Sequence, residues 1–242
     1  MTPFPADLKP LFEQAPLELK GRFMLGSNYT FLVELVHESG NLPAVYKPIR
    51  GEQPLWDFPE NTLAGREVAA YLVSEALGWE LVPYTILRQD GPYGPGSLQE
   101  YIEFNPHYHY FSFKPADKDR LRPLALFDHL VNNADRKGSH IIIEKGTRHL
   151  YAIDHGLCFH EQDKLRTVVW DFAGEAIPEP LLNALESLRK QLLPGSDLHT
   201  ALQAYLSLDE IAALDVRAQA LLKSGCFPQP PTYRRAYPYP PL

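Results

Sequence analysis

The chain has 242 residues, of which 45% are hydrophobic and 22% are charged, and its formal net charge at pH 7 is −7. This composition is typical of a globular protein with one domain or two closely packed lobes. The excess of acidic residues argues against a nucleic-acid partner, because nucleic-acid binding depends on Lys and Arg that neutralise phosphates. No apolar run approaches the roughly 20 residues of a membrane-spanning helix, and we expect no integral membrane association.

Neither the N-terminal residues nor the cysteines indicate export. Residues 1–7 lack the basic start and the apolar core of a signal peptide. Cys158 and Cys226 make neither a disulfide framework nor a Cys-x-x-Cys metal pattern. We therefore expect the protein in a reducing cytoplasm.

The first half of the chain consists mainly of short apolar segments that end at turn residues, as in an antiparallel sheet. One helix interrupts them, because apolar residues recur at helical spacing from Leu63 to Leu77 and Gly78 follows as a helix stop. We predict strands at residues 17–25, 29–36, 43–49, 84–88 and 97–103.

The second half is predicted to be mainly helical, with a β-hairpin inside it. The β-branched residues 141–143, a turn at Lys145-Gly146 and the apolar residues 150–153 indicate the hairpin. We predict helices at residues 119–132, 179–192, 198–206 and 209–222.

This order of elements predicts an α+β fold with two lobes. The first lobe, residues 1–103, has a small antiparallel sheet and one helix, and the mainly helical second lobe covers residues 104–225. A Pro/Tyr-rich tail, residues 226–242, cannot continue a helix. It is an extended arm on the fold, a disordered end or a polyproline ligand for a partner, and the sequence leaves these alternatives open.

Two acidic residues flank the predicted hairpin. Asp135 precedes its first strand and Asp154 follows its second, so both carboxylates should lie at the same end of the hairpin. Kinases use two aspartates in such an arrangement. One receives the proton of the substrate hydroxyl, and the other holds Mg²⁺ on the ATP phosphates.

Candidate phosphate contacts lie in the predicted sheet and its helix. Gly26, Ser27 and Asn28 form a turn whose backbone N–H groups can approach phosphates, although the same residues are typical of an ordinary hairpin turn. Lys47 lies in an apolar strand, where an inward-facing ammonium needs a partner, and Glu67 is the candidate partner. Taken singly, each of these residues is better explained by a structural role.

The motifs gain weight from their order along the chain. Residues 135–140 (Asp-Arg-Lys-Gly-Ser-His) are similar to the Asp-Arg-His-x-x-Asn catalytic loop, and residues 153–156 (Ile-Asp-His-Gly) to the Asp-Phe-Gly element, of the protein-kinase-like superfamily. The chain resembles this superfamily from about residue 17 to residue 222. Within it the chain most resembles the phosphatidylinositol 3-/4-kinase-like branch, which includes uncharacterised bacterial proteins, with the HipA-type Ser/Thr kinases as cousins.

This resemblance implies roles for single residues. Asp135 would be the catalytic aspartate and Asp154 the metal ligand, while Lys47 would bind the α- and β-phosphates and Glu67 would orient Lys47. The backbone of residues 99–102 would face adenine. The resemblance implies ATP as the nucleotide and Mg²⁺ or Mn²⁺ as the metal. The further nucleotide-contacting residues that it implies are Gly26, Ser27, Asn28, Val45, Glu100, Ile102 and Ile153.

Two residues depart from the family pattern. His140 stands where the family has the Asn that binds a second metal, and Lys137 stands where the loop has His. Mg²⁺ prefers oxygen ligands, whereas imidazole suits softer ions such as Mn²⁺ or Zn²⁺, so His140 binds a different metal, no metal or, when protonated, a phosphate. Lys137 is a candidate for contact with the γ-phosphate, where its charge would replace that of a lost metal.

Two further possibilities are weaker. A cluster of five histidines could hold a metal but lacks the helical His spacing of a metallohydrolase. Thr167 lies at the activation-loop position and is either an autophosphorylation site or an ordinary loop residue. The five histidines are His129, His140, His149, His155 and His160.

The residues and the resemblance together predict an ATP-dependent phosphotransferase that moves the γ-phosphoryl group to a hydroxyl of an unidentified protein or small-molecule acceptor. Two alternatives stay open. The first is a nucleotide-binding pseudokinase that performs no transfer, because His140 replaces the metal-binding Asn. The second is AMP transfer on the same fold.

Overall fold

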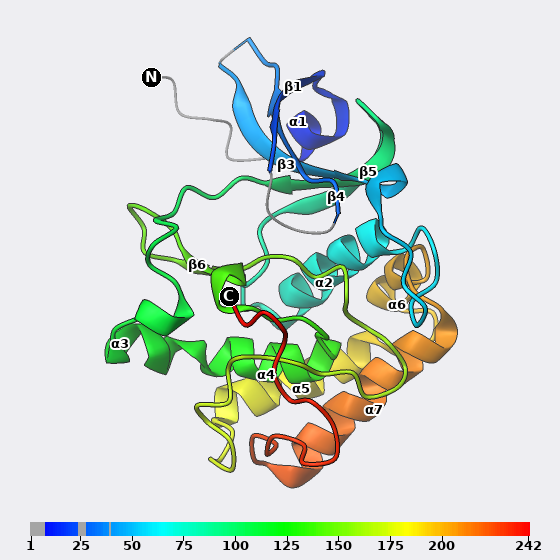
Figure 1. Ribbon diagram of the computed structural model, residues 1–242. Coiled ribbons are helices and arrows are strands. Elements are labelled where there is room, and N and C mark those ends of the chain that lie inside the picture. The colour runs from blue at the N-terminus through cyan, green and yellow to red at the C-terminus, as the bar shows by residue number, and fades with distance from the viewer. Residues whose placement is uncertain (1–7, 24–27, 39) are drawn as a thin grey trace.

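In the computed structural model, which describes residues 8–23, 28–38 and 40–242, a five-stranded antiparallel sheet lies above a mainly helical part (Figure 1). The strand order is β1-β2-β3-β5-β4. Each strand overlaps one of the five predicted strands. The strands are β1 (Leu17–Arg22), β2 (Phe31–Leu35), β3 (Leu42–Pro48), β4 (Thr85–Gly91) and β5 (Gly94–Glu100).

One face of the sheet is covered by α1 (Lys9–Gln14), a short helix that the sequence analysis did not predict. Phe12 of α1 is buried in one apolar cluster with Phe31 of β2 and Tyr46 of β3. Because side chains alternate along a strand, Lys47 projects from the opposite face of β3. That opposite face is turned toward the helical part.

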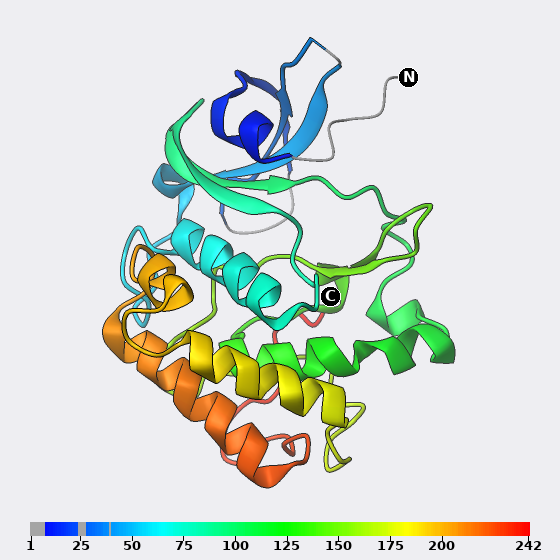
Figure 2. The same ribbon diagram turned by 180° about the vertical axis from the view of Figure 1, so that it is seen from behind.

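The predicted helix after β3 is α2 (Leu63–Leu77), which lies between the sheet and the helical part (Figure 2). It ends at Gly78, whose φ of 65° is a left-handed conformation that glycine adopts without strain. Ala70 and Val73 of α2 are fully buried in the same apolar core as the helices of the second half. The helix that carries Glu67 is therefore packed into the core of the helical part.

A buried arginine adds a polar link between α2 and the helical part. Arg66 is 1% exposed and donates hydrogen bonds to the Glu210 carboxylate and, at 2.6 Å, to the carbonyl of Cys158. Glu210 belongs to α7 (Leu208–Ser224), which begins with a capping box formed by Ser207 and Glu210. These contacts hold α2 on α7.

The remaining predicted helices of the second half are present with shifted bounds, and the helix predicted at 198–206 already ends at Leu202. Residues 119–121 form a 3₁₀ turn, so the predicted helix at 119–132 begins three residues later, with a proline in its first turn. A further short helix, α3 (Pro115–Lys118), was not predicted. The others are α4 (Arg122–Val131), α5 (Glu179–Gln191) and α6 (Asp197–Leu202).

The predicted hairpin consists of β6 (Ile141–Ile143) and β7 (Leu150–Ala152), paired from Ile141 with Ala152 to Ile143 with Leu150. One further hydrogen bond extends the pairing, from the Ile153 N–H to the His140 carbonyl at 3.0 Å. Because the strands are antiparallel, the residue before β6 and the residues after β7 meet at one end of the hairpin. Asp154, which follows β7 at this end, contacts Lys47 of β3.

The Pro/Tyr tail lies on the helical part as an extended arm. Its Phe227 is buried against Phe172, and Arg234 pairs with Asp163. Further along, the Ala236 carbonyl accepts hydrogen bonds from the Thr167 N–H and the Trp170 Nε1–H, and the Pro241 carbonyl accepts one from the Gly138 N–H at 2.8 Å. The tail therefore ends beside the loop that carries Asp135. Of the three alternatives, the structure shows the arm on the fold.

Within residues 8–23, 28–38 and 40–242, no helix has the length and apolar character needed to cross a bilayer. Cys158 is buried and Cys226 is exposed, and both are free thiols. Gly26 and Ser27, predicted to contact phosphates, lie outside the described residues.

Candidate active site

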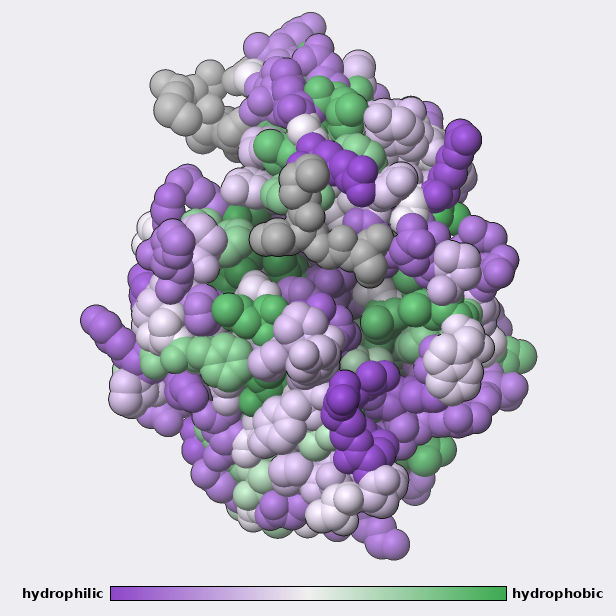
Figure 3. Space-filling model, in the orientation of Figure 1, coloured by the Kyte–Doolittle hydropathy of each residue, from purple (hydrophilic) through white to green (hydrophobic). Residues whose placement is uncertain are grey.

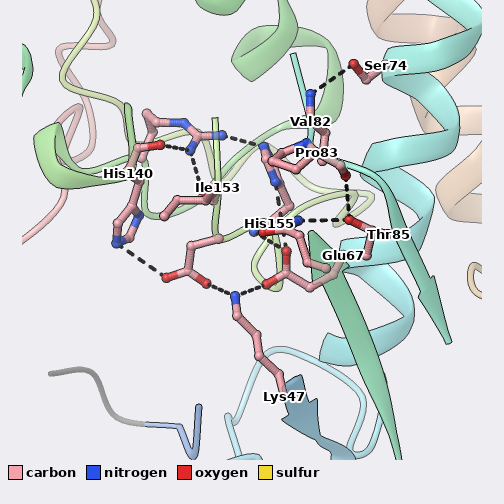
Figure 4. Close-up of polar contacts among 12 residues, drawn as sticks. Lys47, Glu67, Ser74, Val82, Pro83, Thr85, His140, Ile153 and His155 are labelled. Atoms are coloured by element: carbon pink, nitrogen blue, oxygen red, sulfur yellow. Dashed lines mark hydrogen bonds and ion pairs between the residues drawn. The ribbon is translucent and has the colours of Figure 1, made fainter. Parts of the chain in front are cut away.

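The centre of the site is an ammonium held between two carboxylates (Figure 4). Lys47 Nζ donates a hydrogen bond to Glu67 Oε1 and lies 3.0 Å from Asp154 Oδ1. The three residues come from β3, from α2 and from the segment after β7. The structure therefore brings together three of the predicted residues that are far apart in the sequence.

Charge pairing governs the protonation of Lys47. Desolvation acts to lower the pKa of the Lys47 ammonium, but the carboxylates of Asp154 and Glu67 outweigh it and raise the pKa above its usual range. The Glu67 side chain is 3% exposed, so its second oxygen needs a partner in the interior. That partner is the backbone N–H of His155, at 2.9 Å from Oε2.

Asp154 faces a second predicted residue, His140. Asp154 Oδ2 lies 3.4 Å from His140 Nε2, and the Asp154 side chain is 49% exposed, so the carboxylate is open to a ligand. Desolvation acts to raise the pKa of Asp154, but Lys47 and His140 lower it well below its usual range. Asp154 is therefore an anion at neutral pH.

Burial lowers the pKa of His140 to about 4, against the opposing charge of Asp154. The imidazole is neutral near pH 7 and its Nδ1 is buried without a hydrogen-bond partner among the described residues. A neutral imidazole can serve as a metal ligand, whereas the predicted contact between a protonated His140 and a phosphate would require a charge that the site disfavours.

Asp135 lies in the loop of residues 133–140, which precedes β6. Its Oδ2 is 3.0 Å from Lys137 Nζ, and its backbone N–H donates to Asn133 Oδ1 at 2.9 Å. Desolvation raises the pKa of Asp135, although the hydrogen bond from Lys137 opposes the shift. A carboxylate with a raised pKa, open to solvent over 30% of its side chain, is suited to accept a proton.

The residues predicted to contact adenine come from the central strand β3, from the segment after β5 and from the segment after β7. Val45 and Ile153 are half-buried, and Ile102 is buried two residues after β5 ends. The N–H of Glu100 is already bonded to the Tyr84 carbonyl at 2.9 Å within the sheet. Glu100 therefore contributes no free backbone donor there.

Asn28 lies three residues before β2 begins at Phe31. Its Oδ1 accepts a hydrogen bond from the Gln53 N–H at 2.8 Å.

The space-filling view shows the surface hollowed between the sheet and the helical part, with hydrophobic side chains on both sides of the hollow (Figure 3).

A cluster of buried polar residues contacts the segment around Asp154, and the sequence analysis gave these residues no such role. Arg136 is fully buried, pairs with the equally buried Asp128 and lies 2.7 Å from His155 Nε2. The one signal in the sequence was the Arg at the second position of the predicted catalytic loop. Sequence spacing alone could not show that Asp128 and His155 would contact it.

The weaker possibilities are not supported by the contacts. Among the described residues, no group of three or more His, Cys, Asp or Glu side chains could hold a metal. His129 instead packs on Trp170, and His149 is bonded to the Glu80 carbonyl. Thr167 is fully buried and donates to Asp128 Oδ2 at 3.0 Å, so its hydroxyl is closed to phosphorylation in this conformation.

Comparison with known proteins adds a sequence relative. No family model matches the chain. Protein Rv2133c of Mycobacterium tuberculosis (strain ATCC 25618 / H37Rv) is 42% identical over 253 aligned residues, covering 90% of this chain and 90% of the relative. The chain belongs to the Rv2133c family.

Solved structures show which fold the Rv2133c family has. The Helicobacter pylori proinflammatory kinase CtkA matches with a TM-score of 0.52 at 13% identity, over 89% of this chain and 94% of the kinase. Hydra Fam20, solved with sugar, matches with a TM-score of 0.56 at 15% identity, over 89% of this chain and 87% of that chain. These likenesses confirm the predicted α+β, two-lobed, kinase-like fold.

Proposed function

We propose that this protein is an ATP-dependent phosphotransferase that moves the γ-phosphoryl group to a hydroxyl. The proposal rests on one observation: the Lys47 ammonium contacts the carboxylates of both Glu67 and Asp154. Phosphoryl transfer needs a lysine on the phosphates, an acid that orients this lysine and an acid for the metal. The motifs at residues 135–140 and 153–156 favour the phosphatidylinositol 3-/4-kinase-like branch of the fold.

Each residue has a role in this proposal. Lys47 binds the α- and β-phosphates, and Glu67 keeps its ammonium in place. Asp135 accepts the proton of the acceptor hydroxyl on a carboxylate oxygen, for which its raised pKa is suited. Lys137, which pairs with Asp135, would contact the γ-phosphate. Val45, Ile102 and Ile153 would form the apolar walls around adenine.

Asp154 and His140 would hold the divalent metal. Their facing atoms are 3.4 Å apart, and neighbouring ligands of one ion with bonds of about 2.1 Å lie about 3 Å apart, so the pair fits a shared ion. When bound, the metal would neutralise charge on the phosphates. One carboxylate and one neutral imidazole favour Mn²⁺ over Mg²⁺, because imidazole is a poor ligand for Mg²⁺.

The second candidate function is nucleotide binding without transfer. It is favoured by one observation: His140 stands where the resembled family has an Asn ligand. Both candidates predict that ATP binds, and they differ only in whether a phosphoryl group leaves it. AMP transfer differs from both, because the α-phosphate of ATP is then attached to the acceptor.

The deciding experiment uses ATP labelled at the γ- or the α-phosphate, with Mg²⁺ and Mn²⁺ tested separately, on the full chain alone and with protein and metabolite mixtures. Transfer of the γ-label that disappears in Asp135→Asn and Asp154→Asn supports the kinase. Transfer of the α-label supports AMP transfer, and thermal stabilisation by ATP without transfer supports the pseudokinase. If ATP neither stabilises the protein nor donates label, the proposed function is wrong.

A further inference from the structure

The backbone at Asp154 has a conformation that needs outside support. Asp154 has a φ of 64°, in the left-handed region that residues with a side chain adopt only uncommonly. It is followed by His155, which is fully buried. The contacts around Asp154 should therefore include groups that hold this backbone in place.

Arg136 supplies such contacts on both sides of Asp154. Its Nη1 donates to the Ile153 carbonyl at 2.6 Å, and its Nη2 donates to His155 Nε2 at 2.7 Å. Its Nε donates to both carboxylate oxygens of Asp128 at 3.0 and 3.2 Å. The guanidinium thus pairs with Asp128 on α4 and is hydrogen-bonded to the residues before and after Asp154.

The contact between Arg136 and His155 defines the state of the imidazole. A guanidinium has donors but no acceptor, so Nε2 of His155 must accept the hydrogen bond. The proton of the neutral ring is then on Nδ1, which lies 3.9 Å from Glu67 Oε2. The same Glu67 oxygen accepts the hydrogen bond from the His155 backbone N–H (Figure 4).

His155 therefore joins two parts of the site that both act on Asp154. Through its ring it contacts Arg136 in the loop of residues 133–140, and through its backbone it contacts Glu67 on α2, the partner of Lys47. A phenylalanine, which the resembled family has at this position, would fill the space but would accept no hydrogen bond. The polar contact is a feature of this chain.

We propose that Arg136 and His155 are a positioning pair that holds the backbone of Asp154 in its left-handed conformation, so that the carboxylate faces Lys47 and His140. This inference rests on the proposed function for its effect on catalysis. The geometry does not depend on the proposed function, because it is a property of the folded chain. Neither residue needs to touch substrate.

The pair is also connected to the segment after Gly156. The Arg136 N–H donates to the Arg166 carbonyl at 2.9 Å, and the Val168 N–H donates to the Arg136 carbonyl at 3.2 Å. The Thr167 hydroxyl shares Asp128 with the guanidinium. Residues 166–168 are thus hydrogen-bonded to Arg136 and to its partner Asp128.

The test compares His155→Phe with His155→Gln. Phe keeps a ring of similar size but leaves a buried donor of Arg136 without a partner, whereas Gln can present an oxygen close to the position of Nε2. The matched control is His149→Phe, which loses the hydrogen bond to Glu80 at the turn end of the hairpin. Thermal unfolding of all three variants identifies any that fail to fold.

The first readout is Mn²⁺ affinity in the presence of a non-hydrolysable ATP analogue, measured by calorimetry. We expect a loss of about 10- to 100-fold in His155→Phe, the range typical of residues that orient a metal ligand. Affinity should recover in His155→Gln and stay at the wild-type level in His149→Phe. Equal affinity in wild type and His155→Phe, or equal loss in Phe and Gln, would overturn the inference.

The second readout separates this inference from the proposed function. If Asp154→Asn leaves Mn²⁺–nucleotide binding unchanged, the proposed function fails, and a crystal structure of His155→Phe then decides the inference alone. We expect residue 154 to leave the left-handed region or to show two conformations in that variant. An unchanged Asp154 conformation would show that Arg136 and His155 have only a packing role.

Discussion

Lys47 Nζ lies 3.0 Å from Asp154 Oδ1, although the two residues are 107 positions apart in the sequence. This contact closes the gap between the sheet and the helical part, because Lys47 comes from β3 and Asp154 follows β7. Glu67 completes the group from α2, which is packed into the helical core. The Lys47 ammonium on the sheet is thus paired with one carboxylate from α2 and with one from the segment after β7.

Replacing Lys47 by Met should abolish phosphate binding while keeping the length of the side chain. We expect kcat/KM for ATP to fall by about 100-fold or more, as when a charged group at a transition state is removed. The matched control is Lys145→Met, which removes a surface pair with Glu103. Steady-state kinetics measures both variants, and equal activity in Lys47→Met and wild type would contradict the assignment.

Asp135→Asn should lower kcat by about 10²- to 10⁴-fold and leave nucleotide affinity unchanged, because a general base acts on the acceptor and not on ATP. Since burial raises the pKa of Asp135 above the usual value of 3.8, the wild-type rate should fall on acidification at a pH above this value. A pH profile of kcat/KM checks the second point. The exposed Asp119→Asn serves as control, and a matching loss there would contradict the prediction.

His140→Asn should change which metal supports activity. Asn offers an amide oxygen in place of an imidazole nitrogen, so the rate with Mg²⁺ should rise relative to the rate with Mn²⁺. Metal titrations of the labelled-ATP assay measure this ratio. An unchanged ratio would show that His140 does not bind the metal.

His129 should make the fold sensitive to acid. Burial lowers the pKa of His129 from 6.5 to about 4, although Asp163 acts to raise it, and Arg234 acts to lower it further. Between these two pH values the unfolded chain binds a proton that the folded chain does not, so the free energy of unfolding should decrease as pH falls from 6.5 toward 4.

The variant His129→Phe tests this dependence, because Phe can keep the edge contact with Trp170 without a titrating group. Urea unfolding at several pH values should show a smaller decrease for His129→Phe than for wild type. His107→Phe, at an exposed position, should behave like wild type. Parallel curves for wild type and His129→Phe would disprove the role of His129.

Deleting residues 233–242 should free two backbone amides of the site. The Gly138 and Thr167 N–H groups donate to carbonyls of the tail at 2.8 and 3.1 Å, so their hydrogen exchange should become faster in the shortened chain. The Arg166 N–H, bonded to the Asn133 carbonyl, provides the internal control. Unchanged exchange at Gly138 and Thr167 would show that the tail does not protect the loop in solution.

Much of the fold could be predicted because its signals are local. Helix periodicity ending at Gly78, and apolar strands ending at turns, indicated α2 and the strands. The short helices α1 and α3 were missed because four to six residues carry too little periodic signal, and both are held by packing. The start of α4 was misplaced because residues 119–121 form a 3₁₀ turn, which has a similar sequence pattern.

The candidate site could be predicted only where a residue type is costly without a partner. A lysine in an apolar strand and two aspartates beside a hairpin indicated Lys47, Asp135 and Asp154. The pairing of Arg136 with Asp128 and His155 left no comparable signal, because each residue is common on protein surfaces. Their complete burial is what gives them a role.

The sequence by itself determined the order of strands and helices and the chemical groups that could act on a phosphate, because these follow from local periodicity and side-chain chemistry. Only the tertiary structure decided that the Lys47 ammonium pairs with both Glu67 and Asp154 and that His140 is neutral. It also decided that Arg136 is hydrogen-bonded to both neighbours of Asp154. These properties depend on burial and on distances between segments that are far apart in the chain. Such distances are set when the sheet packs on the helical part.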